Sequence, residues 1–238
     1  MSETSNIDKQ VIDTATKSNY VKFSFTITYI LLLTTATITI IEAIRTPNPV
    51  VRHVLNLETC ISIVAGYFYS VFMQQIDESE KKGEIYNWEK ISQTRYVDWS
   101  ITTPMMLLTL CIVLGNNIKK PVPIGIFLVI VLLNYLMLFI GYLGETQKIN
   151  RLWAFILGFV PFFAMFYLIF SRFVLPRYRL DNYILYGIYV GVWSMYGIVY
   201  LLEEEGKNIA MNILDFISKC GVGLGLWAYY VKIFSTTV

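Results

Sequence analysis

The sequence predicts an all-α membrane protein, a bundle of seven transmembrane helices, from three observations. Of the 238 residues, 55% are hydrophobic and 15% are charged, which is too apolar for an ordinary soluble domain. Seven apolar stretches are each long enough to cross about 30 Å of hydrocarbon at about 1.5 Å per residue. The connections between them are short. One domain of seven helices is therefore the simplest organisation.

Each predicted helix is an apolar stretch that ends near charged or polar residues. In chain order the helices are predicted at 20–44, 50–76, 88–115, 121–144, 151–173, 182–202 and 208–234. The longest polar connection, 77–87, separates the second helix from the third. Residues 1–19 are polar, have mixed charge and do not read as a cleavable signal. We therefore expect a polar N-terminal segment, 1–19, followed by a single domain, 20–238.

Basic residues predict the orientation in the membrane. If the N-terminus lies outside, the inner loops and tail contain Arg45, Arg52, Lys119, Lys120, Arg172, Arg177, Arg179 and Lys232. The outer side carries many acidic residues among its lysines and arginines. Because lysine and arginine in short loops favour the cytoplasmic side, the expected arrangement is N-terminus outside and C-terminus cytoplasmic.

Several classes of function are disfavoured by what the chain contains. The three cysteines, Cys60, Cys111 and Cys220, all fall inside predicted helices without paired spacing, which is typical of small packing residues. His53 is the single histidine, which argues against a histidine metal site or a Ser-His-Asp triad. No Gly-rich phosphate loop or basic stripe interleaved with aromatics is present. We expect neither an enzyme nor a nucleic-acid-binding protein.

Five ionisable residues are predicted at membrane depth: Glu58, Arg95, Asp98, Asp215 and Lys219. A lysine at the centre of a helix costs roughly 2.5 to 3.5 kcal/mol on insertion scales, so it indicates a functional site. Asp215 lies four residues before Lys219, on the same helix face. The lysine, the arginine and the two aspartates can form a nearly neutral cluster. Arg95 and Asp98 alone are also explained by a simple helix-stabilising ion pair.

A buried lysine is a good amine nucleophile that forms Schiff bases with carbonyl compounds. An aldehyde is thus the expected ligand, and Asp98 and Asp215 are candidate counterions for the charged Schiff base. Flat aromatic walls suited to an elongated apolar molecule are offered by Tyr96, Trp99, Trp193 and Tyr196. Plain helix packing is the alternative interpretation of these aromatics.

Four segments resemble one known family, the microbial (type 1) rhodopsins. Arg95–Pro104 is similar to its third-helix signature, R-Y-x-D-W-x-x-T-T-P, and Leu214–Lys219 is similar to its seventh-helix lysine motif. Trp193–Tyr196 resembles the sixth-helix pocket, and Met137–Glu145 resembles the fourth helix of proteorhodopsin-like members. The matches occur in the family's order and agree with seven helices.

The resemblance implies all-trans retinal bound covalently to Lys219 as a protonated Schiff base. It also implies that Asp98 is the primary counterion and proton acceptor, that Asp215 is a second counterion near Tyr196, and that Arg95 lies on the extracellular side. The expected pocket residues are Tyr96, Trp99, Thr103, Met137, Gly141, Trp193 and Tyr196.

Departures from the family's pumping pattern affect the expected activity. The position that carries a proton-donating carboxylate in bacteriorhodopsin-like pumps is Thr109, so the functional triplet is Asp98, Thr102 and Thr109. Threonine does not donate protons at ordinary pH, which argues against fast pumping. Glu58 on the second helix is expected near Thr109. It is interpreted as a relocated proton donor, as a residue lining an ion constriction, or as an interfacial glutamate stabilised by the helix dipole.

Other departures concern the fourth and sixth helices and the outer side. Asn134 occupies a fourth-helix position that is acidic in many pumps, and is expected to face Thr103. Gly197 stands where the family usually has proline. Lys207 falls in the outer region, where proton release would require a carboxylate, and the run 203–205 gives an acidic mouth or a solvated loop.

Polar side chains inside the helices suggest a route for ions. Water between helices one, two, three and seven is expected to contact Ser24, Thr26, Thr28, Thr34, Thr35, Thr37, Thr39, Glu58, Ser62 and Asn212. Threonines that bond only the carbonyl four residues earlier are the competing interpretation. The triplet, the short chain and Glu58-Thr59 most resemble group 1 viral rhodopsins, which implies a light-gated cation channel.

The alternatives are an outward proton pump with Glu58 as a slow donor and a photosensor. The expected partners are the lipid bilayer and monovalent cations or protons, and association with further copies of the chain is left open as an alternative. The expected location is a multi-pass position in a membrane, that of the host cell or an organelle if the protein is viral.

Overall fold

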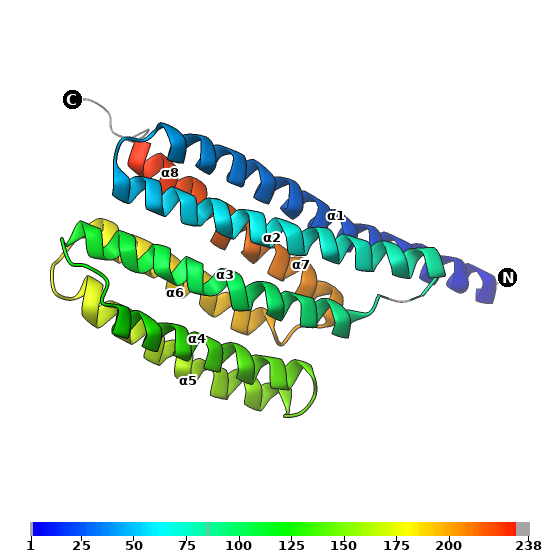
Figure 1. Ribbon diagram of the computed structural model, residues 1–238. Helices are drawn as coiled ribbons and strands as arrows, with labels where there is room; N and C mark the ends of the chain where they lie inside the picture. The colour runs from blue at the N-terminus through cyan, green and yellow to red at the C-terminus, as the bar shows by residue number, and fades with distance from the viewer. Residues whose placement is uncertain (1, 85, 232–238) are drawn as a thin grey trace.

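The computed structural model describes residues 2–84 and 86–231, with side chains from residue 19 onward. Within this part of the chain every regular element is a helix, and the helices run lengthwise beside one another as one bundle (Figure 1). The all-α fold predicted from composition and apolar segments is confirmed.

The first four helices alternate in direction through short connections. Their bounds are α1 Ser2–Arg45, α2 Pro49–Lys82, α3 Trp88–Asn117 and α4 Ile124–Glu145. The later elements are α5 Arg151–Ile169, η1 Phe170–Val174, α6 Leu180–Val199, α7 Glu204–Asp215, η2 Phe216–Gly221 and α8 Val222–Val231. The π-helical turns η1 and η2 continue the helices that precede them, and α8 continues η2. The bundle therefore contains seven rods.

Local chemistry accounts for several helix ends. The Asn48 side chain accepts hydrogen bonds from the first free amides of α2, and Pro49 follows it at a position where proline is favoured. Gly83 ends α2 with φ 66°, a left-handed conformation that suits glycine. Asn87 and Asn150 cap α3 and α5 in the same way as Asn48.

The two ends of the bundle are called here the N-terminal face, where α1 begins and α2 meets α3, and the C-terminal face, where α8 ends (Figure 1). In the view of Figure 1, α1 and α2 form one side and α4 and α5 the other, with α3, α6 and α7 between them. Side chains from α2, α3, α6 and α7 therefore meet in the middle of the bundle.

The main apolar core lies between α2, α3, α5, α6 and α8. Val54, Leu107, Phe166, Tyr189 and Leu226 belong to it and are buried. Large apolar side chains also cover the outside of the bundle, and on α4 Leu132 is 66% exposed. An apolar exterior around an apolar core is what a bilayer requires.

Two predictions about the helices need correction. Within the residues that the structure describes, six helices are long and apolar enough to span a membrane, from Asn19–Arg45 to Glu204–Val231, and α6 falls short of this apolarity. Tyrosines, glycines and an asparagine dilute its apolar residues. The polar segment 1–19 is not separated from the first helix, because the backbone of α1 is helical from Ser2.

Candidate functional site

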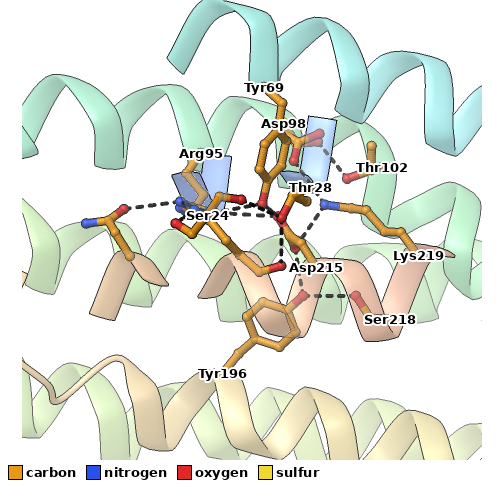
Figure 2. Close-up of polar contacts among 12 residues, drawn as sticks. Ser24, Thr28, Tyr69, Arg95, Asp98, Thr102, Tyr196, Asp215, Ser218 and Lys219 are labelled. Carbon is orange, nitrogen blue, oxygen red and sulfur yellow. Dashed lines mark hydrogen bonds and ion pairs between the residues drawn. The ribbon is translucent and has the colours of Figure 1, made fainter. Parts of the chain in front are cut away.

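Lys219 lies in a buried cluster of four charges at the centre of the bundle (Figure 2). Its Nζ is 3.1 Å from Asp98 Oδ2 on α3 and 3.0 Å from Asp215 Oδ1. Arg95 Nη1 lies 3.4 Å from Asp215 Oδ2. Two cations and two carboxylates give the cluster no net formal charge, which is how buried charges become tolerable.

The two carboxylates have different surroundings. Asp215 accepts hydrogen bonds from the hydroxyls of Tyr69, at 2.8 Å, and Tyr196, at 2.7 Å (Figure 2). Asp98 bonds Lys219 through Oδ2, whereas its Oδ1 has no hydrogen-bond partner among the described residues. Asp215 is thus held on both oxygens, and Asp98 keeps one oxygen free.

Backbone geometry places the lysine. Lys219 lies in the π-helical turn η2, between α7 and α8. Such turns widen a helix locally and occur frequently at functional sites. Arg95 bonds across to α7 rather than to Asp98, and no ion pair joins Arg95 and Asp98 in the described structure. The interpretation of these two as a simple i, i+3 pair is therefore wrong.

Lys219 lines a partly open cavity in which about 840 Å³, open solvent at its mouth included, is free of protein atoms. It is lined by Tyr96, Trp99, Thr103, Met137, Gly141, Trp193 and Tyr196, together with Lys219. All the predicted pocket residues thus lie on one cavity. Its walls are mostly aromatic and apolar, and the amine and Asp215 lie at the same cavity. A flat apolar aldehyde fits this combination.

Part of the lining was not predicted. Phe155, Gly158, Phe159 and Phe162 come from α5, where the sequence shows no recognisable motif. Gly197 on α6 also lines the cavity, and a Cβ there would come within 2.7 Å of Phe159. The missing side chain lets α5 and α6 approach each other. Sequence reasoning also missed Tyr69, since nothing in α2 indicates which residue it meets on α7.

A further buried carboxyl, besides Asp98 and Asp215, lies on the C-terminal side of Lys219. Glu58 is 2% exposed and faces Thr109. A Cβ on Gly223, four residues after Lys219, would be 3.0 Å from Glu58 Oε2. The expected proximity of Glu58 and Thr109 is confirmed, and the interpretation of Glu58 as an interfacial residue is wrong because its side chain is enclosed.

Only some of the predicted polar route is inside the bundle. Ser24, Thr28, Thr35 and Thr39 on α1 are buried, as are Ser62 and Asn212. Thr34 and Thr37 are exposed on the outside, and Thr26 is half-buried. The buried threonines Thr28, Thr35 and Thr39 bond the carbonyl four residues earlier. Thr39 also bonds Thr59 of α2 at 2.8 Å. Thr34 and Thr37 are therefore removed from the route.

Further predicted positions are resolved by the structure. Asn134 donates to Thr103 Oγ1 at 2.8 Å, which confirms that these two side chains face each other. Thr102 is buried and donates to the Asp98 carbonyl. Lys207 is not a loop residue but is 1% exposed on α7, paired with Glu145 at 2.9 Å and Glu204 at 2.8 Å. The acidic run is thus partly neutralised rather than simply solvated.

Comparison with known proteins identifies the family. Residues 19–233 match the family model described as bacteriorhodopsin-like protein. The chain is a microbial rhodopsin. It is therefore a multi-pass integral membrane protein, and the family binds retinal through a lysine Schiff base.

Individual relatives agree with this assignment. The crystal structure of the viral rhodopsin OLPVRII is 43% identical, with a TM-score of 0.83, and the match covers 90% of this rhodopsin and 99% of that chain. Blue light-absorbing proteorhodopsin from Med12 has the same fold, with a TM-score of 0.71 at 23% identity over 91% of this chain and 100% of that one.

A curated relative is matched over a shorter length. Green-light absorbing proteorhodopsin of Gamma-proteobacterium EBAC31A08 is 27% identical over 159 residues, which are 58% of this chain and 61% of that protein. The match thus spans less than two thirds of the relative's length.

Proposed function

We propose that Lys219 is the attachment point of all-trans retinal. Among the lysines whose side chains the structure describes, Lys207 and Lys219 are fully buried, and of these two Lys219 lines the aromatic cavity. Lys207 is paired with Glu145 and Glu204 instead. The ion pairs with Asp98 and Asp215 supply the negative charge that a cationic nitrogen needs at this position.

We further propose that the protein moves protons across the membrane under light. When bound, retinal supplies light-driven isomerisation, which changes the direction and proton affinity of the nitrogen of Lys219. Asp98 is the expected acceptor, because its Oδ2 is within hydrogen-bond reach of that nitrogen and its Oδ1 is free. Asp215 is less available, since two tyrosine hydroxyls and Arg95 already satisfy it.

Glu58 is the expected donor from the C-terminal side. Its carboxyl lies against Gly223, one turn beyond Lys219, and its Oε1 is buried without a hydrogen bond of ordinary geometry. A carboxyl can deliver a proton, whereas the neighbouring Thr109 cannot at ordinary pH. An enclosed acceptor, Asp98, at the nitrogen of Lys219 and a further enclosed carboxyl, Glu58, on its C-terminal side are the observation that carries the proposal of proton transport.

The light-gated cation channel expected from the sequence is the second candidate. It is supported by buried polar side chains that lie along α1, both toward the N-terminal face and toward the C-terminal face from Lys219. Asn212 donates to Ser24 at 2.9 Å toward the N-terminal face, and Thr39 bonds Thr59 toward the C-terminal face. Assignment to group 1 of the viral rhodopsins, and the orientation with the N-terminus outside, remain predictions.

Voltage-clamp recording of cells that express the protein with retinal separates the candidates. A pump gives a photocurrent that stays outward at all ordinary voltages, and we expect this result. A photocurrent that reverses when the cation gradient is inverted supports the channel. A coloured pigment with no photocurrent contradicts both and favours a photosensor. Cells without retinal are the control.

A further inference from the structure

Arg95 lies against two adjacent aromatic rings. Its guanidinium carbon lies 5.0 Å from the ring centroid of Phe72 on α2 and 5.5 Å from that of Phe25 on α1. Both phenylalanines are fully buried, and their own centroids are 5.2 Å apart. A guanidinium within about 6 Å of a ring is attracted to it, most strongly where water is excluded.

Polar groups of α7 hold the same guanidinium from the other side. Arg95 Nη2 donates to Asn208 at 3.1 Å and to Asn212 at 2.9 Å. Its Nη1 reaches Asp215 (Figure 2). Its Nε is buried and has no hydrogen-bond partner among the residues that the structure describes. The rings of Phe25 and Phe72 therefore stabilise a guanidinium whose hydrogen bonds are incomplete. Side chains of α1, α2, α3 and α7 close together around this one cation.

The closure lies between the charge cluster and the N-terminal face. Arg95 precedes Asp98 by nearly one turn on α3, and Asn208 precedes Asp215 by nearly two turns on α7. Both helices run from the N-terminal to the C-terminal face. Arg95 and the side chains that contact it therefore lie between Asp98 and the N-terminal face, in the region enclosed by α1, α2, α3 and α7.

We propose that Phe25 and Phe72 are positioning residues that lock Arg95 as a gate on the N-terminal side. The rings keep the guanidinium beside Asn208, Asn212 and Asp215 and exclude water from the opening. The gate opens when the guanidinium leaves the rings. The effect of this gate on ion or proton transport rests on the function proposed above. Its exclusion of small polar molecules from Lys219 does not.

The rate at which a small polar reagent reaches the lysine–retinal bond tests directly whether Arg95 blocks the N-terminal side. Hydroxylamine is a small polar nucleophile that cleaves this bond and bleaches the pigment. In the dark, Phe72→Leu and Phe25→Leu are expected to bleach about tenfold to thirtyfold faster than wild type, which corresponds to about 1.4 to 2 kcal/mol for one desolvated cation–π contact. Phe23→Leu is the matched control because Phe23 is 65% exposed on the same helix as Phe25. It is expected to bleach at the wild-type rate.

A double substitution distinguishes loss of the gate from a general loosening of the helix packing as the cause of faster bleaching. If the rings act through the guanidinium, adding Phe72→Leu to Arg95→Gln produces no further increase in the bleaching rate. Independent, multiplicative effects would overturn the proposal. So would equal rates for Phe72→Leu, Phe25→Leu and Phe23→Leu. The two ring variants lie on different helices, so failure of one to bind retinal leaves the other to decide.

Photocurrents of the same variants then test the link to transport. With the gate weakened, the photocurrent of Phe72→Leu is expected to lose its strict direction and to acquire a reversal voltage. If the wild type gives no photocurrent while the bleaching rates change as expected, the transport proposal fails and the gate stands. If transport is present and the bleaching rates do not change, the gate fails alone.

Discussion

Each of the four central charges depends on another. Lys219, Asp98, Asp215 and Arg95 are all buried, and three ion pairs join them. Removal of one partner from a buried pair typically costs about 3–5 kcal/mol because it leaves an unpaired charge. We therefore expect a neutral substitution of any one of these four residues to destabilise the protein and to change the absorption of the pigment.

Replacement of Asp98 by asparagine tests its role as counterion and acceptor. We expect Asp98→Asn to shift the absorption to longer wavelength, since a nearby negative charge stabilises a cation on the nitrogen of Lys219 in the ground state. The photocurrent should fall by about 10²-fold or more, as for loss of a general base. Absorption spectra and voltage clamp are the measurements. Ser100→Ala is the control, and an unchanged current in Asp98→Asn would contradict the assignment.

Replacement of Glu58 by glutamine tests the donor. Because the amide carries no transferable proton, Glu58→Gln should slow the recovery of the pigment after a flash by about tenfold to 10²-fold, while the dark spectrum is retained. Glu78→Gln, whose side chain is 63% exposed, is the control. Flash photolysis measures both. Wild-type recovery in Glu58→Gln would remove Glu58 from the proton path.

The sequence predicted which residues form the site better than it predicted which residues they contact on other helices. Lys219, Asp98 and the cavity residues are found together because a local motif fixes each helix face. Tyr69 and Asn208 could not be predicted, since their contacts join helices more than 100 residues apart. Lys207 was misplaced for the same reason, because its burial depends on Glu145 of another helix.

Helices hold the site through a few polar contacts between them. Asn182 of α6 is fully buried, and its amide donates to the carbonyls of Leu114 at 3.0 Å and Phe173 at 3.1 Å. It also accepts from Asn117 at 2.8 Å. One side chain thus fastens the start of α6 to α3 and η1, near the C-terminal face.

Loss of this contact should weaken the bundle without changing the pigment. Asn182→Ala leaves two carbonyls without this amide, so we expect the free energy of unfolding to fall by about 2–3 kcal/mol. The absorption spectrum should remain that of the wild type. Thermal bleaching measures the loss, with exposed Asn116→Ala as the control. Equal thermal stability of the two variants would show that Asn182 does not fasten α6.

Helix positions were largely predictable because each apolar stretch is bounded by polar residues. The ends of α2 and α3 also follow from Asn48, Gly83 and Asn87. The π-helical turn around Lys219 was not predictable, since no residue in Phe216–Gly221 marks it. The helical continuation of α1 through 2–19 was missed because its composition is polar.

For the molecule as a whole, composition decided the fold class, and family motifs then located the ligand. Seven rods that pack with an apolar exterior leave few alternatives for a chain of this length. The mode of transport depends on the paths between helices, which local sequence does not determine. Glu58 illustrates this, because its proximity to Thr109 and Gly223 depends on how α2, α3 and α8 pack.

The central claim is that Lys219 binds retinal in the aromatic cavity. The most direct measurement is the visible absorption of purified Lys219→Ala after addition of all-trans retinal, beside Lys207→Ala as the matched buried lysine. The account predicts that Lys219→Ala forms no pigment, while Lys207→Ala does. A visible pigment in folded Lys219→Ala, with the same spectrum as the wild type, would contradict it.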